Sequence, residues 1–145
     1  MTIFIGADHR GFELKNRLME YLQEKNIRVE DMGNYTHEPL DNFPEFGKKV
    51  AMAVSQNPNE FFGIAVCGAG IGMSVAANRI KGVRAGLCDS IRQVEHGRTN
   101  DHMNVLCLAA DYLTFDEARS LVDAFLDTPM RQDEKYIKRA KMLDE

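Results

Sequence analysis

The feature that most constrains this chain is an apolar run, Phe61–Val66 (FFGIAV), that ends at a glycine-rich turn. A run of this length with almost no polar side chain is typical of a strand buried on both faces, as in parallel sheets covered by helices. Further short β-rich runs lie at Thr2–Gly6, Ile27–Met32, Gly82–Leu87 and Asn104–Ala109. The chain therefore contains five candidate strands.

Segments with apolar residues at helical spacing separate these strands and follow the last one. They are Gly11–Lys25, Phe43 or Pro44 to about Ser55, Ser74–Ile80, Ser90–Arg98, Thr114 to about Asp127, and Asp133–Leu143. Thr114 with Glu117 three residues later forms a capping box that marks one helix start. Strands alternating with helices predict a parallel sheet covered on both faces, which is a doubly wound α/β domain. Ligands of such sheets bind beyond the carboxyl ends of the strands.

Length and composition limit the classes of protein to which this chain can belong. A chain of 145 residues corresponds to one domain, 1–145, at roughly 100–200 residues per domain. The net charge of −4 argues against a broad nucleic-acid surface. No apolar run approaches the ~20 residues of a membrane span, and the first residues lack a signal peptide's apolar stretch. Three cysteines cannot all pair within the chain, which favours a reducing compartment. We expect a cytoplasmic protein without a membrane or nucleic-acid partner.

The turn Cys67–Gly72 (CGAGIG) is the first candidate site. Its glycines allow the backbone to turn tightly and to direct N–H groups into one concavity that can hold an anion. A tight strand-to-helix turn without a ligand is the alternative interpretation. Cys67 lies at the mouth of this turn, where a thiolate is stabilised and can act as nucleophile or base. Cys88 and Cys107 lie in or at the ends of apolar strands, which favours inert core positions.

A second polar loop, Ala7–Gly11, follows the first strand. If the two strands are neighbours, Asp8 and His9 lie beside the Cys67 turn, although His9 on its own is equally compatible with a capping role. His96 and His102 flank a polar segment before the fifth strand. No group of histidines and carboxylates has the spacing of a metal site, so we expect neither a metal nor another cofactor.

The last helix carries Lys135 and Arg139 four residues apart, on one face. Such a basic face is usually solvated, and a role in anion binding is the alternative interpretation.

Together, four segments of the sequence resemble the ribose-5-phosphate isomerase B family, which also contains the galactose-6-phosphate isomerase subunits. The matching segments are GADHRGFELK at 6–15, DNFPEFGKKVA at 41–51, CGAGIGMSVAANRIKGVRA at 67–85 and NVLCLA at 104–109. The resemblance covers essentially the whole chain and implies a Rossmann-like three-layer sandwich with a five-stranded parallel sheet. It also implies a homodimer or homotetramer with active sites shared between subunits. The implied reaction is metal-free isomerisation of a sugar phosphate through an enediol.

The resemblance also implies roles for individual residues. Cys67 matches the base that moves a proton between C1 and C2. The amides of Gly68, Ala69, Gly70, Ile71 and Gly72 match an anion hole for the enediolate, where a preorganised donor is worth about 3–4 kcal/mol. Asp8 and His9 match residues that hold the substrate's ring oxygen, hydroxyls or phosphate. Arg139 matches one of two phosphate-binding arginines, and Lys135 stands in place of the other.

The sequence departs from the family pattern near the fifth strand. Asn100, or Thr99 if one residue is inserted, stands where the family has the histidine that opens the sugar ring, and His96 or His102 is a candidate replacement. By position, the resemblance implies a catalytic place for Asn100 and a substrate contact for Asp101. Ala69 replaces a common threonine or serine. Asp111 replaces an arginine that reaches a phosphate site, and we expect its carboxylate to face away or to pair with a cation such as Arg139.

We therefore expect a metal-independent aldose–ketose isomerase of a phosphorylated sugar. One alternative is a different short substrate such as a tetrose phosphate, which cannot close into a ring and needs no ring-opening histidine. Another is a non-catalytic or half-catalytic subunit of a hetero-oligomeric isomerase. A third and weaker alternative is a thiol-dependent binding or redox module.

Overall fold

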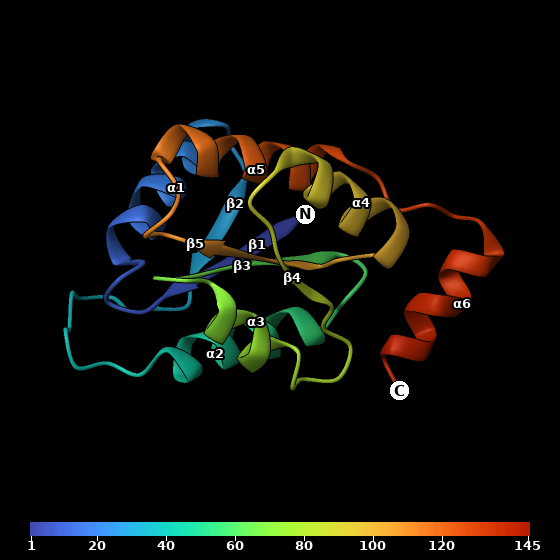
Figure 1. Ribbon diagram of the computed structural model, residues 1–145, viewed down its shortest axis with the longest axis horizontal. Helices are drawn as coiled ribbons and strands as arrows, with labels where there is room; N and C mark the ends of the chain where they lie inside the picture. Colours follow the sequence, from blue (N-terminus) through green and yellow to red (C-terminus); the bar gives the residue numbers. More distant parts are fainter.

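The computed structural model describes residues 1–145 and contains one five-stranded sheet (Figure 1). All strand pairs are parallel, and the order across the sheet is β2-β1-β3-β5-β4. The strands are β1 (Thr2–Ala7), β2 (Arg28–Asp31), β3 (Phe61–Cys67), β4 (Ala85–Leu87) and β5 (Val105–Ala109). The predicted α/β class and five-stranded parallel sheet are therefore confirmed.

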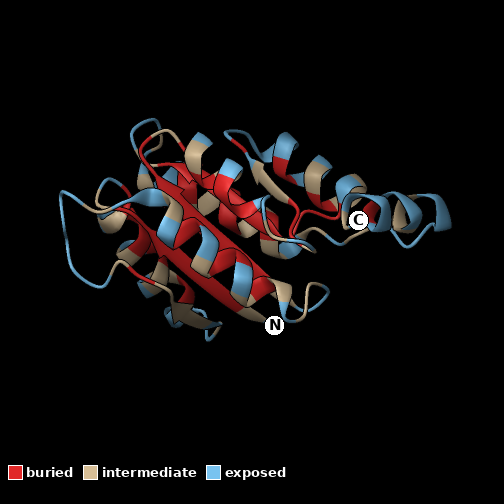
Figure 2. Ribbon diagram, turned by 90° about the horizontal axis from the view of Figure 1, so that it is seen from below, coloured by how far each residue is buried: buried red, intermediate tan, exposed pale blue.

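Helices cover both faces of the sheet. The helices are α1 (Phe12–Glu24), α2 (Phe43–Ser55), α3 (Ile71–Ala77), α4 (Ile91–Asp101), α5 (Phe115–Asp127) and α6 (Glu134–Leu143). One apolar core joins α1, α4 and α5 to the sheet, and a second core joins α2 and α3 to the opposite face. Figure 2 shows the sheet as a buried layer between helices whose outer sides are exposed. None of the helices has the length and apolar character that crossing a membrane requires.

The strand order reverses direction between β1 and β3. From β1 the chain moves outward to β2, and from β3 it moves the other way, first to the edge strand β4 and then back to β5. Residues Ala7 and Val66 lie opposite each other at the carboxyl ends of these two strands. The loops after β1 and β3 are therefore neighbours, which fulfils the condition for placing Asp8 and His9 beside the Cys67 turn, and they flank the crevice where doubly wound sheets bind ligands.

The boundaries of α3, α4 and β4 differ most from those expected. Helix α3 begins at Ile71 rather than Ser74, because Gly70 has a left-handed conformation (φ 76°) that lets the chain enter the helix within the glycine turn. Helix α4 continues to Asp101, past the expected end at Arg98, and stops where His102 takes the left-handed conformation (φ 53°). Strand β4 has only three residues. The capping box of Thr114 and Glu117 is confirmed.

Helix α6 lies apart from the carboxyl edge of the sheet. In Figure 1 strands β3 and β5 end at the left, whereas α6 stands at the right, beside the C-terminal end of α4. Arg84, just before β4, pairs with Asp144 at 2.6 Å and holds the end of α6 against the sheet. The basic face of α6 is thus at the amino edge of the sheet.

Candidate active site

Asp8 begins the loop after β1 and is 5% exposed. Its amide donates to the Val66 carbonyl at 3.3 Å, which ties the loop directly to β3. Its Oδ1 accepts the amides of Arg10 and Gly11 at 3.0 and 3.1 Å. Asp8 therefore fixes the turn that leads into α1 with one carboxylate oxygen, while its Oδ2 makes no hydrogen bond within the chain.

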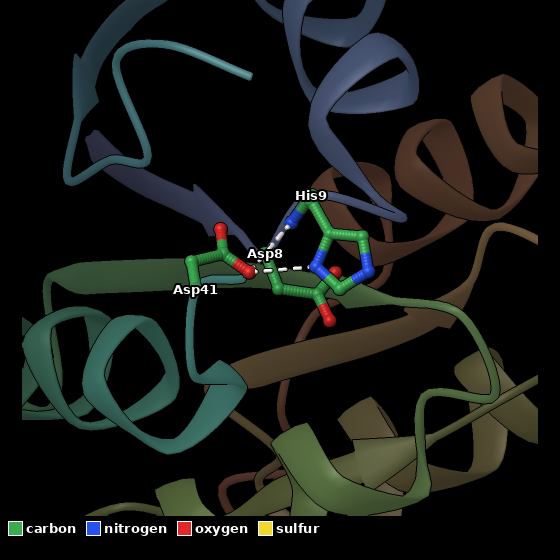
Figure 3. Close-up of side chains that lie close together, drawn as sticks. All are labelled: Asp8, His9 and Asp41. Atoms are coloured by element: carbon green, nitrogen blue, oxygen red, sulfur yellow. Dashed lines mark hydrogen bonds and ion pairs between the residues drawn. The ribbon is translucent and has the colours of Figure 1, made fainter. Parts of the chain in front are cut away.

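His9 is held by Asp41, a residue that the sequence analysis did not select (Figure 3). Asp41 Oδ1 contacts the His9 amide at 3.1 Å and the ring Nδ1 at 2.7 Å. Burial by itself raises the Asp41 pKa, but hydrogen bonds from His9 and Asn34 outweigh it, so the pKa lies below the ordinary value. The ionised carboxylate keeps a proton on Nδ1 of His9 and leaves Nε2 available to a ligand.

A buried lysine anchors the segment that carries Asp41. Lys15 of α1 is fully buried, and its Nζ donates to Asp31 at 2.9 Å and to the Asn34 carbonyl. The Asn34 side chain in turn donates to Asp41 Oδ2 at 3.1 Å. The sequence signal for Asp41 was available, since it precedes the Pro44 helix start, but only the tertiary structure connects it with His9.

Cys67 is the last residue of β3, and its side chain faces the core that contains α2 and α3. It is 6% exposed, and its Sγ accepts the amide of Gly70 at 3.2 Å. The amides of Gly68 and Ala69 make no hydrogen bond within the chain. The first helical hydrogen bond of α3 runs from Ser74 to Gly70, so the first-turn amides also lack helical acceptors. A thiol thus lies beside several unpaired backbone donors.

The other two cysteines differ from Cys67 in their surroundings. Burial raises the pKa of Cys88 to about 11, with a smaller contribution from Asp89. Burial raises the pKa of Cys107 even further, because this side chain is completely enclosed beneath the sheet. Both groups are neutral thiols at physiological pH, in agreement with the inert core positions that the sequence predicted.

The rim of the Cys67 turn carries an ion pair between Arg10 and Asp111. The Asp111 carboxylate faces a cation, as expected, but this cation is Arg10 of the first loop rather than Arg139. The Asp111 amide donates to the Gly68 carbonyl at 3.0 Å, which fixes the segment after β5 to the glycine turn. Sequence analysis missed Arg10, because nothing in its local sequence distinguishes it from an ordinary surface arginine.

Asn100 and Asp101 lie at the opposite edge of the sheet, in the last turn of α4. The Asn100 side chain contacts His96 Nδ1 at 3.1 Å, and His96 Nε2 lies 3.8 Å from Asp101 Oδ2. His96 and Asp101 also line a cavity of about 810 Å³ between β4 and α4. His102 is buried, and its Nε2 is 2.9 Å from the Arg131 carbonyl, so this ring is engaged within the fold.

Lys135 and Arg139 are exposed on α6, on either side of the Tyr136 ring. Their cationic groups lie 5.1 and 5.4 Å from the centre of that ring. The register pairs Cys67 with Ala109 at the end of β5, whereas α4 and α6 lie near its start. The first and last of the five residues of β5 are about 13 Å apart, at ~3.3 Å for each step along the strand. Within one chain, the structure does not bring these cations to Cys67.

Asp8, His9 and Asp41 are the one group whose side chains could together hold a metal, with ligand atoms within 4.8 Å of one another. However, Asp41 Oδ1 and His9 Nδ1 bond to each other, and Asp8 Oδ1 already accepts two amides. These three atoms therefore already have hydrogen-bond partners within the protein, as Figure 3 illustrates for His9 and Asp41.

A thiol, unpaired amides and a histidine–carboxylate pair therefore lie together at the switch point of this parallel α/β fold. Comparison with known proteins identifies the family. Residues 3–143 match the model of the ribose/galactose isomerase family, and the chain belongs to this family. It is an aldose–ketose isomerase.

Individual relatives match over most of their length. The chain is 37% identical to ribose-5-P isomerase B of Listeria innocua, over 88% of this chain and 85% of the relative. The crystal structure of ribose-5-phosphate isomerase B from Mycoplasma genitalium with bound ribulose-5-phosphate has a TM-score of 0.93, with 35% identity and coverage of 98% and 93% of the two chains. The corresponding enzyme of Thermotoga maritima has a TM-score of 0.90, with 38% identity and coverage of 99% and 97%.

The His9–Asp41 pair predicts a pH-dependent contribution to stability. Because the folded-state pKa of Asp41 lies below its ordinary value of 3.8, the carboxylate stabilises the fold above about pH 4 and loses this effect as the pH falls further. We expect Asp41→Asn to lower the free energy of unfolding by about 1 kcal/mol at pH 7 and by less below about pH 3. Urea unfolding at several pH values measures this difference, and the exposed Asp89→Asn is the control. A constant difference across this pH range would contradict the assignment.

Proposed function

We propose that this isomerase interconverts ribose 5-phosphate and ribulose 5-phosphate, without a metal, by proton transfer through an enediolate. The observation that carries the proposal is the Cys67 thiol beside unpaired amides, directly next to the Asp8–His9 loop. A base, an anion hole and groups for sugar hydroxyls are the parts that such a reaction needs. The related crystal structure from Mycoplasma genitalium, an isomerase with bound ribulose-5-phosphate, supports the same substrate pair.

In the proposed reaction, the thiolate of Cys67 removes the proton from C2 of the open-chain aldose. The electrons form the C1–C2 double bond, and the carbonyl oxygen at C1 becomes an enediolate oxygen. A proton passes from the hydroxyl oxygen O2 to the enediolate oxygen O1, and the proton held by Cys67 returns to C1 as the C2–O2 bond becomes the ketone carbonyl. Cys67 suits this role because its sulfur already accepts an amide hydrogen bond, whereas burial raises the pKa of Cys88 to about 11 and Cys107 is completely enclosed.

The backbone of the glycine turn supplies the charge stabilisation. The unpaired amides of Gly68 and Ala69, together with the first-turn amides of α3, are donors for the enediolate oxygen. Ala69 lacks the hydroxyl that the family often has, so these contacts depend on the backbone alone. Asp8 Oδ2 and His9 Nε2 remain available for the hydroxyls of the sugar, because Asp41 and the local amides occupy their other polar atoms.

Ring opening is the step for which the sequence left two histidines as candidates. His102 is buried and bonded to the Arg131 carbonyl, whereas His96 is exposed and adjacent to Asn100. We therefore assign ring opening to His96, oriented by Asn100 and Asp101. A proton leaves the hydroxyl at C1 and the ring oxygen gains one as the C1–O4 bond breaks, a proton exchange that an imidazole catalyses.

The complete site then requires two copies of the chain. Cys67, Asp8 and His9 lie at the carboxyl edge, while His96, Asn100, Asp101, Lys135 and Arg139 lie at the amino edge. We propose that the amino edge of a second copy covers the Cys67 turn and brings its basic α6 to the substrate phosphate. A homodimer of this kind has two equivalent sites.

The first prediction concerns Cys67. We expect Cys67→Ala to fold and to lose at least about 100-fold in kcat with ribose 5-phosphate, because the base is missing. Cys88→Ala is the matched control and should retain kcat. Both are assayed by ribulose 5-phosphate formation with EDTA present, since no step uses a metal. Near-normal turnover by Cys67→Ala, or a wild-type rate that depends on added divalent ions, would overturn the mechanism.

The second prediction separates ring opening from proton transfer. Ribose 5-phosphate closes into a furanose, but erythrose 4-phosphate cannot, because its O4 carries the phosphate. We expect His96→Ala to reduce kcat/KM for ribose 5-phosphate by about 10-fold or more and to leave any tetrose phosphate activity unchanged. The exposed neighbour Glu95→Ala is the control. Wild-type activity on the tetrose phosphate alone would instead favour the short-substrate alternative.

The third prediction tests the shared site. Cys67→Ala and Arg139→Ala carry their changes at opposite edges, so a mixed dimer contains one site with neither change. We expect each variant alone to be impaired at low substrate, and their mixture to recover about a quarter of wild-type activity after subunit exchange. Mixing each variant with itself is the control. A mixture that never exceeds the two separate activities would contradict sharing.

A further inference from the structure

The Arg10–Asp111 pair at the rim of the Cys67 turn has no role in the reaction described so far. The Arg10 guanidinium lies directly against Gly68, where a Cβ atom would come within 2.4 Å of Cζ and Nε. With no side chain at Gly68, the guanidinium packs directly on the backbone at the edge of this turn. One cation of this chain thus lies at the same edge as Cys67.

One contact holds the guanidinium and two fix the backbone on either side of it. The guanidinium contacts Asp111 Oδ2, the Arg10 backbone amide donates to Asp8 Oδ1 at 3.0 Å, and the Asp111 amide donates to the Gly68 carbonyl at 3.0 Å. The Arg10 side chain is nevertheless 55% exposed, against 32% for Asp111. A guanidinium has five N–H donors in a rigid fork, so the single carboxylate leaves donors free for a second anion.

We propose that Arg10 binds the phosphate of the substrate and that Asp111 is the positioning residue that holds its guanidinium over Gly68. How deeply Cys67 and Arg10 lie in the site indicates which part of the substrate Arg10 contacts. Cys67 is 6% exposed and reaches the reacting carbons, whereas Arg10 lies on the rim, where the far end of a bound sugar phosphate emerges. Asp111 does not repel this phosphate strongly, because its charge is already paired with Arg10.

This inference rests on the proposed function, so the test combines a kinetic and a binding measurement. We expect Arg10→Ala to raise KM for ribose 5-phosphate about tenfold, with kcat changed less than threefold. Calorimetric binding of inorganic phosphate, which needs no turnover, should weaken by a similar factor. Arg10→Lys should be intermediate, because it keeps the charge and loses the fork. Arg17→Ala, whose guanidinium stacks on Phe115 away from the loop, is the matched control.

A charge exchange distinguishes phosphate binding from a merely structural role. Arg10→Asp leaves two carboxylates at the rim and should raise KM more than Arg10→Ala does. Adding Asp111→Arg restores one cation and one carboxylate at the same place, and KM should return to within a few fold of wild type. The proposal is overturned if the active wild type and Arg10→Ala share the same KM and phosphate affinity, or if the exchange rescues nothing. A wild type that binds phosphate through Arg10 but does not isomerise ribose 5-phosphate would overturn the proposed function alone.

Discussion

The parallel pairing of β1 with β3 is the constraint on which the rest of the site depends. It sets Ala7 opposite Val66, so the polar loop after one strand and the thiol at the end of the other begin side by side. The approach is close enough that a Cβ at Gly11 would lie 2.6 Å from the Val66 carbonyl oxygen, so only glycine fits there. Because the strand order diverges at this pair, the crossover helices leave the crevice above it open.

The fold and the carboxyl-edge loops could be predicted because their signals are local. The apolar run of β3 and the helical spacing of α1, α2 and α5 depend only on which faces are buried. The rule that parallel strands end at one edge then brings Asp8 to Cys67 without further information. The predicted helix boundaries were wrong where the backbone takes a left-handed conformation, at Gly70 and His102, because hydrophobic periodicity carries no signal for that conformation.

The contacts that tune the site could not be predicted, because they join residues that are far apart in the chain. Asp41 reaches His9 across 32 positions, and it does so only because the buried Lys15 fixes the segment between them. In the sequence, nothing connects Asp41 with His9, and the structure places it just before Asn42, the residue at the cap position of α2. Asp111 was expected to pair with a cation, and its partner Arg10 comes from a loop whose conformation Asp8 sets.

The two edges of the sheet carry different sets of charged residues. A parallel sheet keeps its strand starts and strand ends a full strand apart, about 13 Å here, which exceeds the length of one sugar phosphate. Lys135 and Arg139 therefore cannot act on a ligand bound at Cys67 of their own chain. Arg10 differs from these two residues, because it places a cation at the carboxyl edge, where it can attract the phosphate of a ligand bound at Cys67. A substrate can then be oriented at the thiol by residues of one chain, while the partner's amino edge encloses it and contributes the groups for ring opening.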